Sequence, residues 1–173
     1  SGGAIRHTAV IPIAGDQITN DIAMALRTPT HEAEEIKQRY AVAKQALANA
    51  SASFEVPGLG DRAPRLLSHQ SLAAVVEPRV EELFSLVAQV IRESGYEELL
   101  SSGIVLAGGT AQIPGMVELG EDVFLKQVRV ARPAYSGSLA DLVCSPRYAT
   151  ALGLLEEARR QWLRGGVVSR QTG

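Results

Sequence analysis

The sequence predicts an α/β fold with a parallel or mixed sheet, and two observations carry this prediction. Short apolar runs of strand length alternate along the chain with amphipathic stretches of helical period. In addition, the apolar run at residues 104–107 (IVLA) passes directly into Gly108 and Gly109. A buried strand that ends in a loop almost free of side chains lets a ligand approach the backbone at the end of a sheet.

The composition is that of a globular protein with a core of its own. Of the 173 residues, 46% are hydrophobic and 21% are charged. This composition excludes an intrinsically disordered chain. The net charge of -2 argues against a general nucleic-acid binder, because it offers no basic excess to neutralise phosphates. The single cysteine, Cys144, rules out an internal disulfide and fits a reducing compartment.

The first part of the chain predicts a strand followed by two helices. Residues 4–11 read as the strand, and residues 12–15 as a turn. Residues 16–26 have apolar side chains at helical spacing. A second helix is predicted over residues 31–48, with Thr30 as its N-cap and acidic residues in its first turn.

The middle of the chain predicts two short strands and a long helix. The strands are expected at residues 54–56 and 66–67, on either side of a loop rich in glycine and proline. Helical spacing then runs through residues 71–93 and ends at Ser94 and Gly95. Pro78 is expected to kink or restart this helix, since proline lacks the backbone donor of the helical ladder.

The last part alternates again between strands and helices. A buried strand is predicted at residues 104–107, a helix at 114–124 with Pro114 in its first turn, and a short strand at 127–131. A final helix is expected over residues 147–162.

One loop is a candidate for ligand contact, and it has a purely structural alternative. Gly108 and Gly109 either form a nucleotide-binding loop or simply make a tight turn between a strand and a helix. Glu34 and Lys37 lie three residues apart on one helix face, and this spacing by itself indicates an exposed ion pair. The three histidines are scattered and have no metal-ligand spacing, so no metal site is predicted.

Four segments of the chain resemble one protein family. They are residues 3–12 (GAIRHTAVIP) leading into 15–23 (GDQITNDIA), residues 33–37 (AEEIK), residues 72–83 (LAAVVEPRVEEL), and residues 103–110 (GIVLAGGT) with 114–115 (PG). In this order they resemble the second half of the FtsA family of bacterial cell-division proteins. The resemblance implies an actin-like ATPase (ribonuclease H-like) subdomain that carries a small inserted α+β lobe.

The resemblance also implies a division of the chain and a set of site residues. The larger lobe is expected at residues 1–48 and 100–163, the inserted lobe at 49–99, and a disordered tail at 164–173. By resemblance, the adenosine side of the nucleotide site is formed by Gly108, Gly109, Thr110, Glu34 and Lys37.

Partner docking is expected from two arginines of the inserted lobe, Arg65 and Arg79. By resemblance, this lobe docks the acidic tail of FtsZ, and arginine suits carboxylates because its planar fork donates two hydrogen bonds. The alternative is that both are ordinary surface arginines.

The intact family member is expected to bind ATP with Mg²⁺, to form filaments with other copies and to contact other division proteins. It is expected to be cytoplasmic, at the inner membrane of the division site, and to reach that membrane through a tail helix absent from this chain. The two Gly- and Thr-rich phosphate loops of actin-like ATPases are not found in this sequence. We therefore expect a fragment, soluble by itself, that binds ATP poorly and has no hydrolytic activity or catalytic residue.

Two other functions differ in class from this one. The chain is alternatively a nucleotide-independent interaction module of the division machinery, which the missing phosphate loops favour. An unrelated dinucleotide-binding enzyme is disfavoured, because the loop lacks the Gly-x-Gly-x-x-Gly pattern and its downstream acidic partner.

Overall fold

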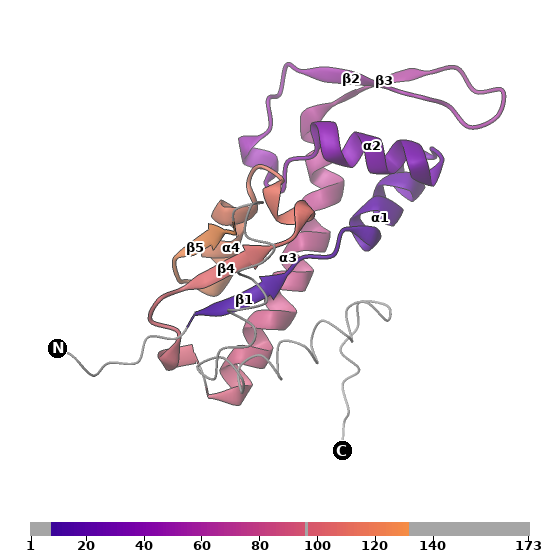
Figure 1. Ribbon diagram of the computed structural model, residues 1–173. Helices are drawn as coiled ribbons and strands as arrows, with labels where there is room; N and C mark the ends of the chain where they lie inside the picture. The colour runs from indigo at the N-terminus through magenta and orange to yellow at the C-terminus, as the bar shows by residue number, and fades with distance from the viewer. Residues whose placement is uncertain (1–7, 96, 132–173) are drawn as a thin grey trace.

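The computed structural model describes residues 8–95 and 97–131. The larger of its two sheets is parallel. Its strands are β1 (Ala9–Pro12), β4 (Ile104–Ala107) and β5 (Val128–Val130), in the order β1-β4-β5. Ala9 pairs with Ile104, which in turn pairs with Val128. Because all three strands run in one direction, their carboxyl ends lie at one edge of the sheet (Figure 1). The predicted α/β class is confirmed, and the architecture is consistent with part of an actin-like ATPase fold.

Two helices follow β1 beyond that edge (Figure 1). The first, α1 (Asp16–Leu26), has the predicted bounds and buries one apolar stripe at a spacing of four residues. The second, α2 (Thr30–Tyr40), begins near the predicted residue, but Pro29 rather than Thr30 occupies the N-cap position.

The predicted extension of the second helix to residue 48 is wrong. The helix ends at Tyr40, and Ala41 adopts an extended conformation with φ −66° and ψ 139°. Tertiary contacts account for the difference: Tyr40 stacks on Phe54 with ring centroids 4.4 Å apart, and the Ala43 amide donates to the Pro114 carbonyl at 2.8 Å. A short 3₁₀ helix, η1 (Gln45–Leu47), follows.

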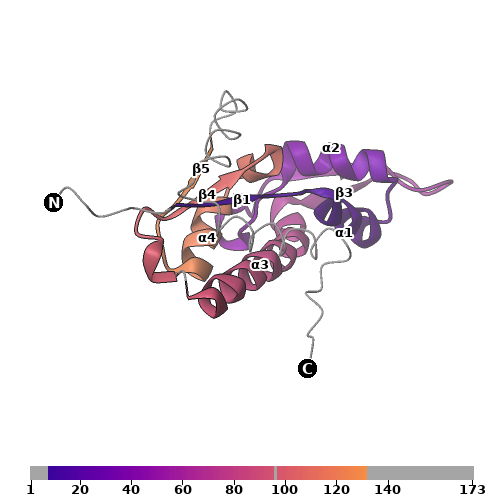
Figure 2. The same cartoon turned by 60° about the horizontal axis from the view of Figure 1, so that its bottom comes forward.

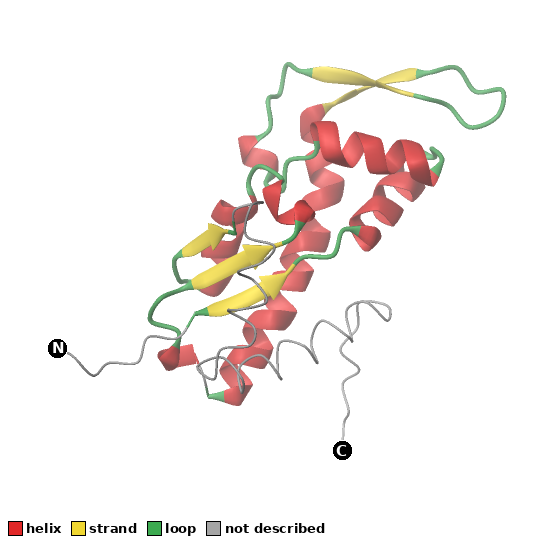
Figure 3. Cartoon of the chain, viewed as in Figure 1, coloured by secondary structure: helices red, strands yellow, loops and turns green. Residues whose placement is uncertain are grey.

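An antiparallel hairpin lies at one end of the described molecule (Figure 3). Its strands, β2 (Ser53–Val56) and β3 (Arg65–Ser68), contain the two predicted strand segments, which are therefore confirmed. The hairpin leads directly into α3 (His69–Ser94), which ends at Gly95 with φ 77° as expected for a helix-terminating glycine.

Helix α3 continues through Pro78 as a single element of 26 residues, so the expected restart at this proline does not occur. The helix tolerates the proline because residue 78 is exposed. The Ala74 carbonyl, which loses its usual helical donor there, belongs to an exposed residue and can bond to water.

The chain between β4 and β5 contains two helical segments instead of the single predicted one. A 3₁₀ turn, η3 (Gly109–Gln112), comes first, and α4 (Met116–Phe124) begins two residues later than expected. Gly115 precedes α4 with φ 93°, and a Cβ there would lie 3.0 Å from the Lys44 amide nitrogen. This close approach to the segment after α2 sets the start of the helix. Before β4, η2 (Glu97–Leu99) forms a further 3₁₀ turn.

One continuous hydrophobic cluster joins the sheet, the hairpin and the long helix. Helices α3 and α4 lie on the same side of the sheet (Figure 2), where the Phe84 and Phe124 rings are 5.3 Å apart. The cluster includes residues from both predicted lobes, among them Ile11, Leu106, Phe54, Val56, Leu72 and Phe84. The division into lobes stays a prediction. Residues 4–7 of the expected first strand, the helix at 147–162, the tail at 164–173 and Cys144 lie outside the described residues.

Candidate functional site

A pocket of about 580 Å³ lies between the end of α2 and the loop after β4. Glu34, Lys37 and Gln38 line it from α2, and Gly109 and Thr110 line it from the loop. Four of the five predicted nucleotide-site residues therefore meet in one pocket, although 72 positions separate Lys37 from Gly109 in the sequence. The fifth predicted residue, Gly108, directly precedes the lining residue Gly109 but is not itself part of the lining.

The loops after β1 and β4 come together beside this pocket because the two strands are parallel neighbours. Gly108 has φ 97°, and a Cβ on it would lie 3.2 Å from the Ile13 carbonyl oxygen. The positive φ favours glycine at this position, and the lack of a Cβ eases the close approach of the two loops. Nothing lies within 4 Å of a Cβ built on Gly109, so its backbone is open to a ligand.

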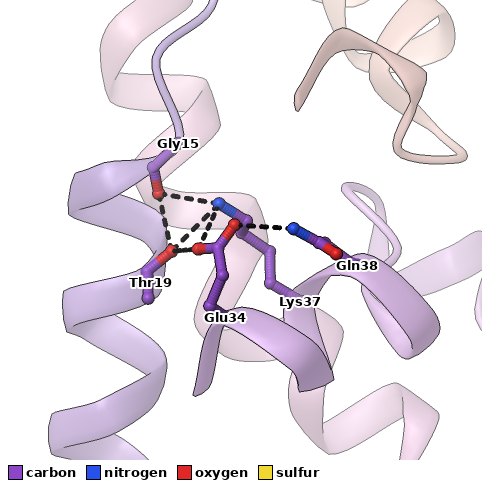
Figure 4. A network of polar contacts seen from close by, with 5 residues as sticks. All are labelled: Gly15, Thr19, Glu34, Lys37 and Gln38. Carbon is purple, nitrogen blue, oxygen red and sulfur yellow. Dashed lines mark hydrogen bonds and ion pairs between the residues drawn. The ribbon is translucent and has the colours of Figure 1, made fainter. Parts of the chain in front are cut away.

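Lys37 is the centre of a polar network that joins α1 to α2 (Figure 4). Only 5% of the residue is exposed, and its Nζ donates to the Gly15 carbonyl oxygen at 3.2 Å and to Thr19 Oγ1 at 2.9 Å. The same Nζ lies 2.9 Å from Glu34 Oε2. A buried ammonium group needs such partners, since an unpaired charge would be costly to remove from water. Lys37 and Glu34 thus form an ion pair that is buried at the lysine, and their contact with a nucleotide stays a prediction.

The Glu34 carboxylate is held from three sides and remains partly open to solvent. Thr19 Oγ1 donates to Oε2 and Gln38 Nε2 donates to Oε1, while 41% of the side chain is exposed. Burial alone would raise the pKa of Glu34, but the hydrogen bonds from Thr19, Lys37 and Gln38 outweigh it and lower the pKa below its ordinary value. Glu34 is therefore an ionised hydrogen-bond acceptor at neutral pH.

Aromatic and apolar side chains form the other wall of the pocket. Tyr40 and His69 line it, and their rings are 5.5 Å apart in an edge arrangement. Sequence reasoning missed both residues, as well as Gln38. Gln38 lies four positions after Glu34 and so shares its helix face, a signal that would have found it. His69 follows the hairpin and carries no local signal of this kind.

The two arginines predicted to bind a partner lie away from this pocket, and both are engaged within the chain. Arg65 donates to the Leu26 carbonyl oxygen. Arg79 binds the Asp21 carboxylate with two hydrogen bonds, of 2.7 Å and 3.1 Å, and lies 3.3 Å from Glu82. The hydrogen bonds to Asp21 raise the pKa of Arg79. These contacts tie α1 to the hairpin and to α3.

Two further findings concern residues 8–95 and 97–131. Within them, no three histidine, cysteine, aspartate or glutamate side chains gather in a way that would hold a metal ion. In the same residues, no helix combines the length and hydropathy needed to cross a membrane.

Comparison with known proteins gives consistent matches. A model of the family described as "Cell division protein FtsA" matches residues 1–153. Proteins of that name are 60% identical in Pseudomonas aeruginosa over 153 residues, 45% in Neisseria meningitidis over 157 and 44% in Escherichia coli over 172. These alignments cover 88%, 90% and 95% of the chain, but 37%, 38% and 41% of the respective relatives. The chain thus spans about two fifths of the length of these relatives.

Proposed function

Because the chain belongs to the FtsA family of cell division proteins, we propose that it supplies the adenosine side of an ATP site within a longer protein. The observation that carries this proposal is the pocket that Glu34 and the open loop residue Gly109 line together. A role in cell division follows from the family itself.

The pocket has the chemistry that a nucleoside requires. A carboxylate kept ionised by its neighbours can accept hydrogen bonds from ribose hydroxyls. The apolar and aromatic wall offers a surface to a flat base. A glycine without a side chain nearby lets the ligand lie against the loop. Phosphates and Mg²⁺ would be held mainly by other parts of the intact protein, so we assign this chain no hydrolytic role.

Titration of the isotope-labelled chain with adenosine and with ATP, followed by NMR, tests this proposal. We expect both to shift the amide signals of Gly109, Thr110 and Lys37, with a Kd on the order of 1 mM, or about −4 kcal/mol. Glu34→Ala should abolish the shifts, whereas the matched control Glu35→Ala, on the exposed face of the same helix, should preserve them. The absence of shifts in the unmodified chain would contradict the nucleoside site. A micromolar Kd for ATP would contradict the proposal that this chain carries only the adenosine side of the ATP site.

We also propose that Arg65 and Arg79 dock the acidic tail of FtsZ, which makes the chain an interaction module as well. The supporting observation is that the guanidinium group of Arg79 already binds a carboxylate, that of Asp21, through two hydrogen bonds from Nε and Nη2. A peptide carboxylate would have to replace Asp21 in that position.

A fluorescence titration with an FtsZ tail peptide tests the docking proposal, because the peptide must displace Asp21 from Arg79. Asp21→Asn should strengthen binding, since it removes the competing charge, and Arg65→Ala combined with Arg79→Ala should weaken it by about tenfold or more. Arg92→Ala, near the opposite end of α3, serves as the control. Unchanged affinity in the double variant would refute the proposal.

Family membership further supports a set of proposals about the intact protein. We propose that it binds ATP with Mg²⁺, forms filaments with other copies and contacts other proteins of the division machinery. We place it at the cytoplasmic face of the inner membrane.

A further inference from the structure

The hydroxyl group of Thr19 contacts both Glu34 and Lys37, two residues that line the candidate site. Only 4% of Thr19 is exposed, and its Oγ1 accepts from Lys37 Nζ at 2.9 Å. Oγ1 also lies within hydrogen-bond distance of the Gly15 carbonyl and of Glu34 Oε2. A hydroxyl has a single hydrogen to donate, and a carboxylate is the stronger acceptor. Thr19 therefore donates to Glu34 and accepts from Lys37.

The donors of Lys37 are all used within the protein. An ammonium group has three hydrogens, and Nζ has three acceptors in Gly15, Thr19 and Glu34. Lys37 thus has no hydrogen left for a ligand unless one of these contacts breaks. Its role at the pocket is to hold other groups, with its hydrocarbon stem forming part of the wall.

The acceptor positions of Glu34 can be counted in the same way. A carboxylate has about four acceptor positions, two on each oxygen. Thr19 and Lys37 fill those on Oε2, and Gln38 fills one on Oε1 at 2.9 Å. Among the described residues no further donor is bonded to Oε1, so one of its acceptor positions remains, on a side chain that lines the pocket.

We propose that Thr19 is a positioning residue that orients Glu34, so that its remaining acceptor position receives a ribose hydroxyl. This inference rests on the proposed nucleoside site and specifies how that site distinguishes ribose from deoxyribose. Thr19 is buried and is not among the residues that line the pocket, so it acts on the ligand through Glu34.

The test compares Thr19→Val, which keeps the shape of the side chain without its hydroxyl, with Thr19→Ser, which keeps the hydroxyl. Adenosine, 2′-deoxyadenosine and 3′-deoxyadenosine are titrated into each chain by NMR. The unmodified chain and Thr19→Ser should prefer adenosine about tenfold over at least one deoxy analogue, the effect of one hydrogen bond to a charged group. In Thr19→Val this ratio should fall to about one, because the carboxylate loses one of the three groups that fix its orientation.

A second readout separates positioning from a general loss of structure. Titration of the Glu34 side-chain carboxyl by ¹³C NMR should show a higher pKa in Thr19→Val than in the unmodified chain, and recovery in Thr19→Ser, since the Thr19 hydrogen bond lowers this pKa. If Thr19→Val does not fold, Thr19→Ala is measured in its place.

The outcomes distinguish this inference from the proposed function. If the unmodified chain binds no nucleoside, the proposed function fails and the role of Thr19 in ribose recognition fails with it. If adenosine binds but Thr19→Val keeps the same preference for ribose, the positioning role alone is refuted. The same holds if all three ligands weaken equally while the Glu34 pKa stays unchanged.

Discussion

Single residues beside the pocket join segments that are distant in the sequence. Gly15 shows this most clearly, because it has φ −96°, which any residue can adopt, and yet has no room for a side chain. A Cβ there would lie 2.3 Å from Lys37 Nζ and 2.5 Å from Thr110 Oγ1. The loop after β1, helix α2 and the loop after β4 therefore meet at this glycine.

Gly15→Ala should lower the free energy of unfolding by about 1–3 kcal/mol, measured by urea denaturation. The added methyl group displaces the buried Lys37 Nζ and breaks hydrogen bonds that have no replacement. Gly109→Ala is the matched control, since a Cβ there meets nothing within 4 Å. Equal stability of the Gly15→Ala and unmodified chains would show that Lys37 moves without cost.

Among the elements, α3 has the most extensive role, because it runs from the hairpin to the far side of the sheet (Figure 1). Its first turn is secured by Ser68, whose side chain accepts a hydrogen bond of 3.0 Å from the Ser71 amide. Ser68 is also the last residue of β3, so one side chain joins the end of the strand to the start of the helix.

Ser68→Ala should cost about 1 kcal/mol in the free energy of unfolding, because an N-cap acceptor is lost. Ser85→Ala in the same helix is the control. Ser85 is exposed in the helix interior, where alanine is the better helix former, so this change should be neutral or slightly stabilising. Thermal denaturation followed by circular dichroism compares the two, and an equal effect of both changes would contradict the capping role.

In the molecule as a whole, the hairpin end and the sheet share one core. Phe84 is fully buried on α3 and contacts the ring of Phe124 on α4, while the same cluster includes Val56 of the hairpin and Leu106 of the sheet. A shared core favours cooperative unfolding of the described part of the chain.

Phe84→Ala should destabilise the fold by about 3–5 kcal/mol, through lost burial and the cavity that remains. Hydrogen exchange should show that amides of β1 and of β2 lose protection together, because both pack on the same cluster. Leu66→Ala on the hairpin is the control, since Leu66 is 73% exposed and its loss should change stability by no more than about 0.5 kcal/mol. Loss of protection in one part alone would indicate two independently unfolding lobes.

Local patterns in the sequence were sufficient for the type of each described α-helix and β-strand and for the family, but not for the three 3₁₀ helices. The bounds of α1, the buried strand β4 and the glycine that ends α3 follow from spacing and residue type within a few positions. Contacts between distant residues decided the rest. Packing against the loop before α4 ends α2 at Tyr40, and Arg79 is paired with Asp21 from 58 positions away. The role of Lys37 depends on Gly15 and Thr19, which only the packing of α1 against α2 brings within reach. Such pairings have no periodic signal in the chain, because they arise from the geometry of elements that have already formed.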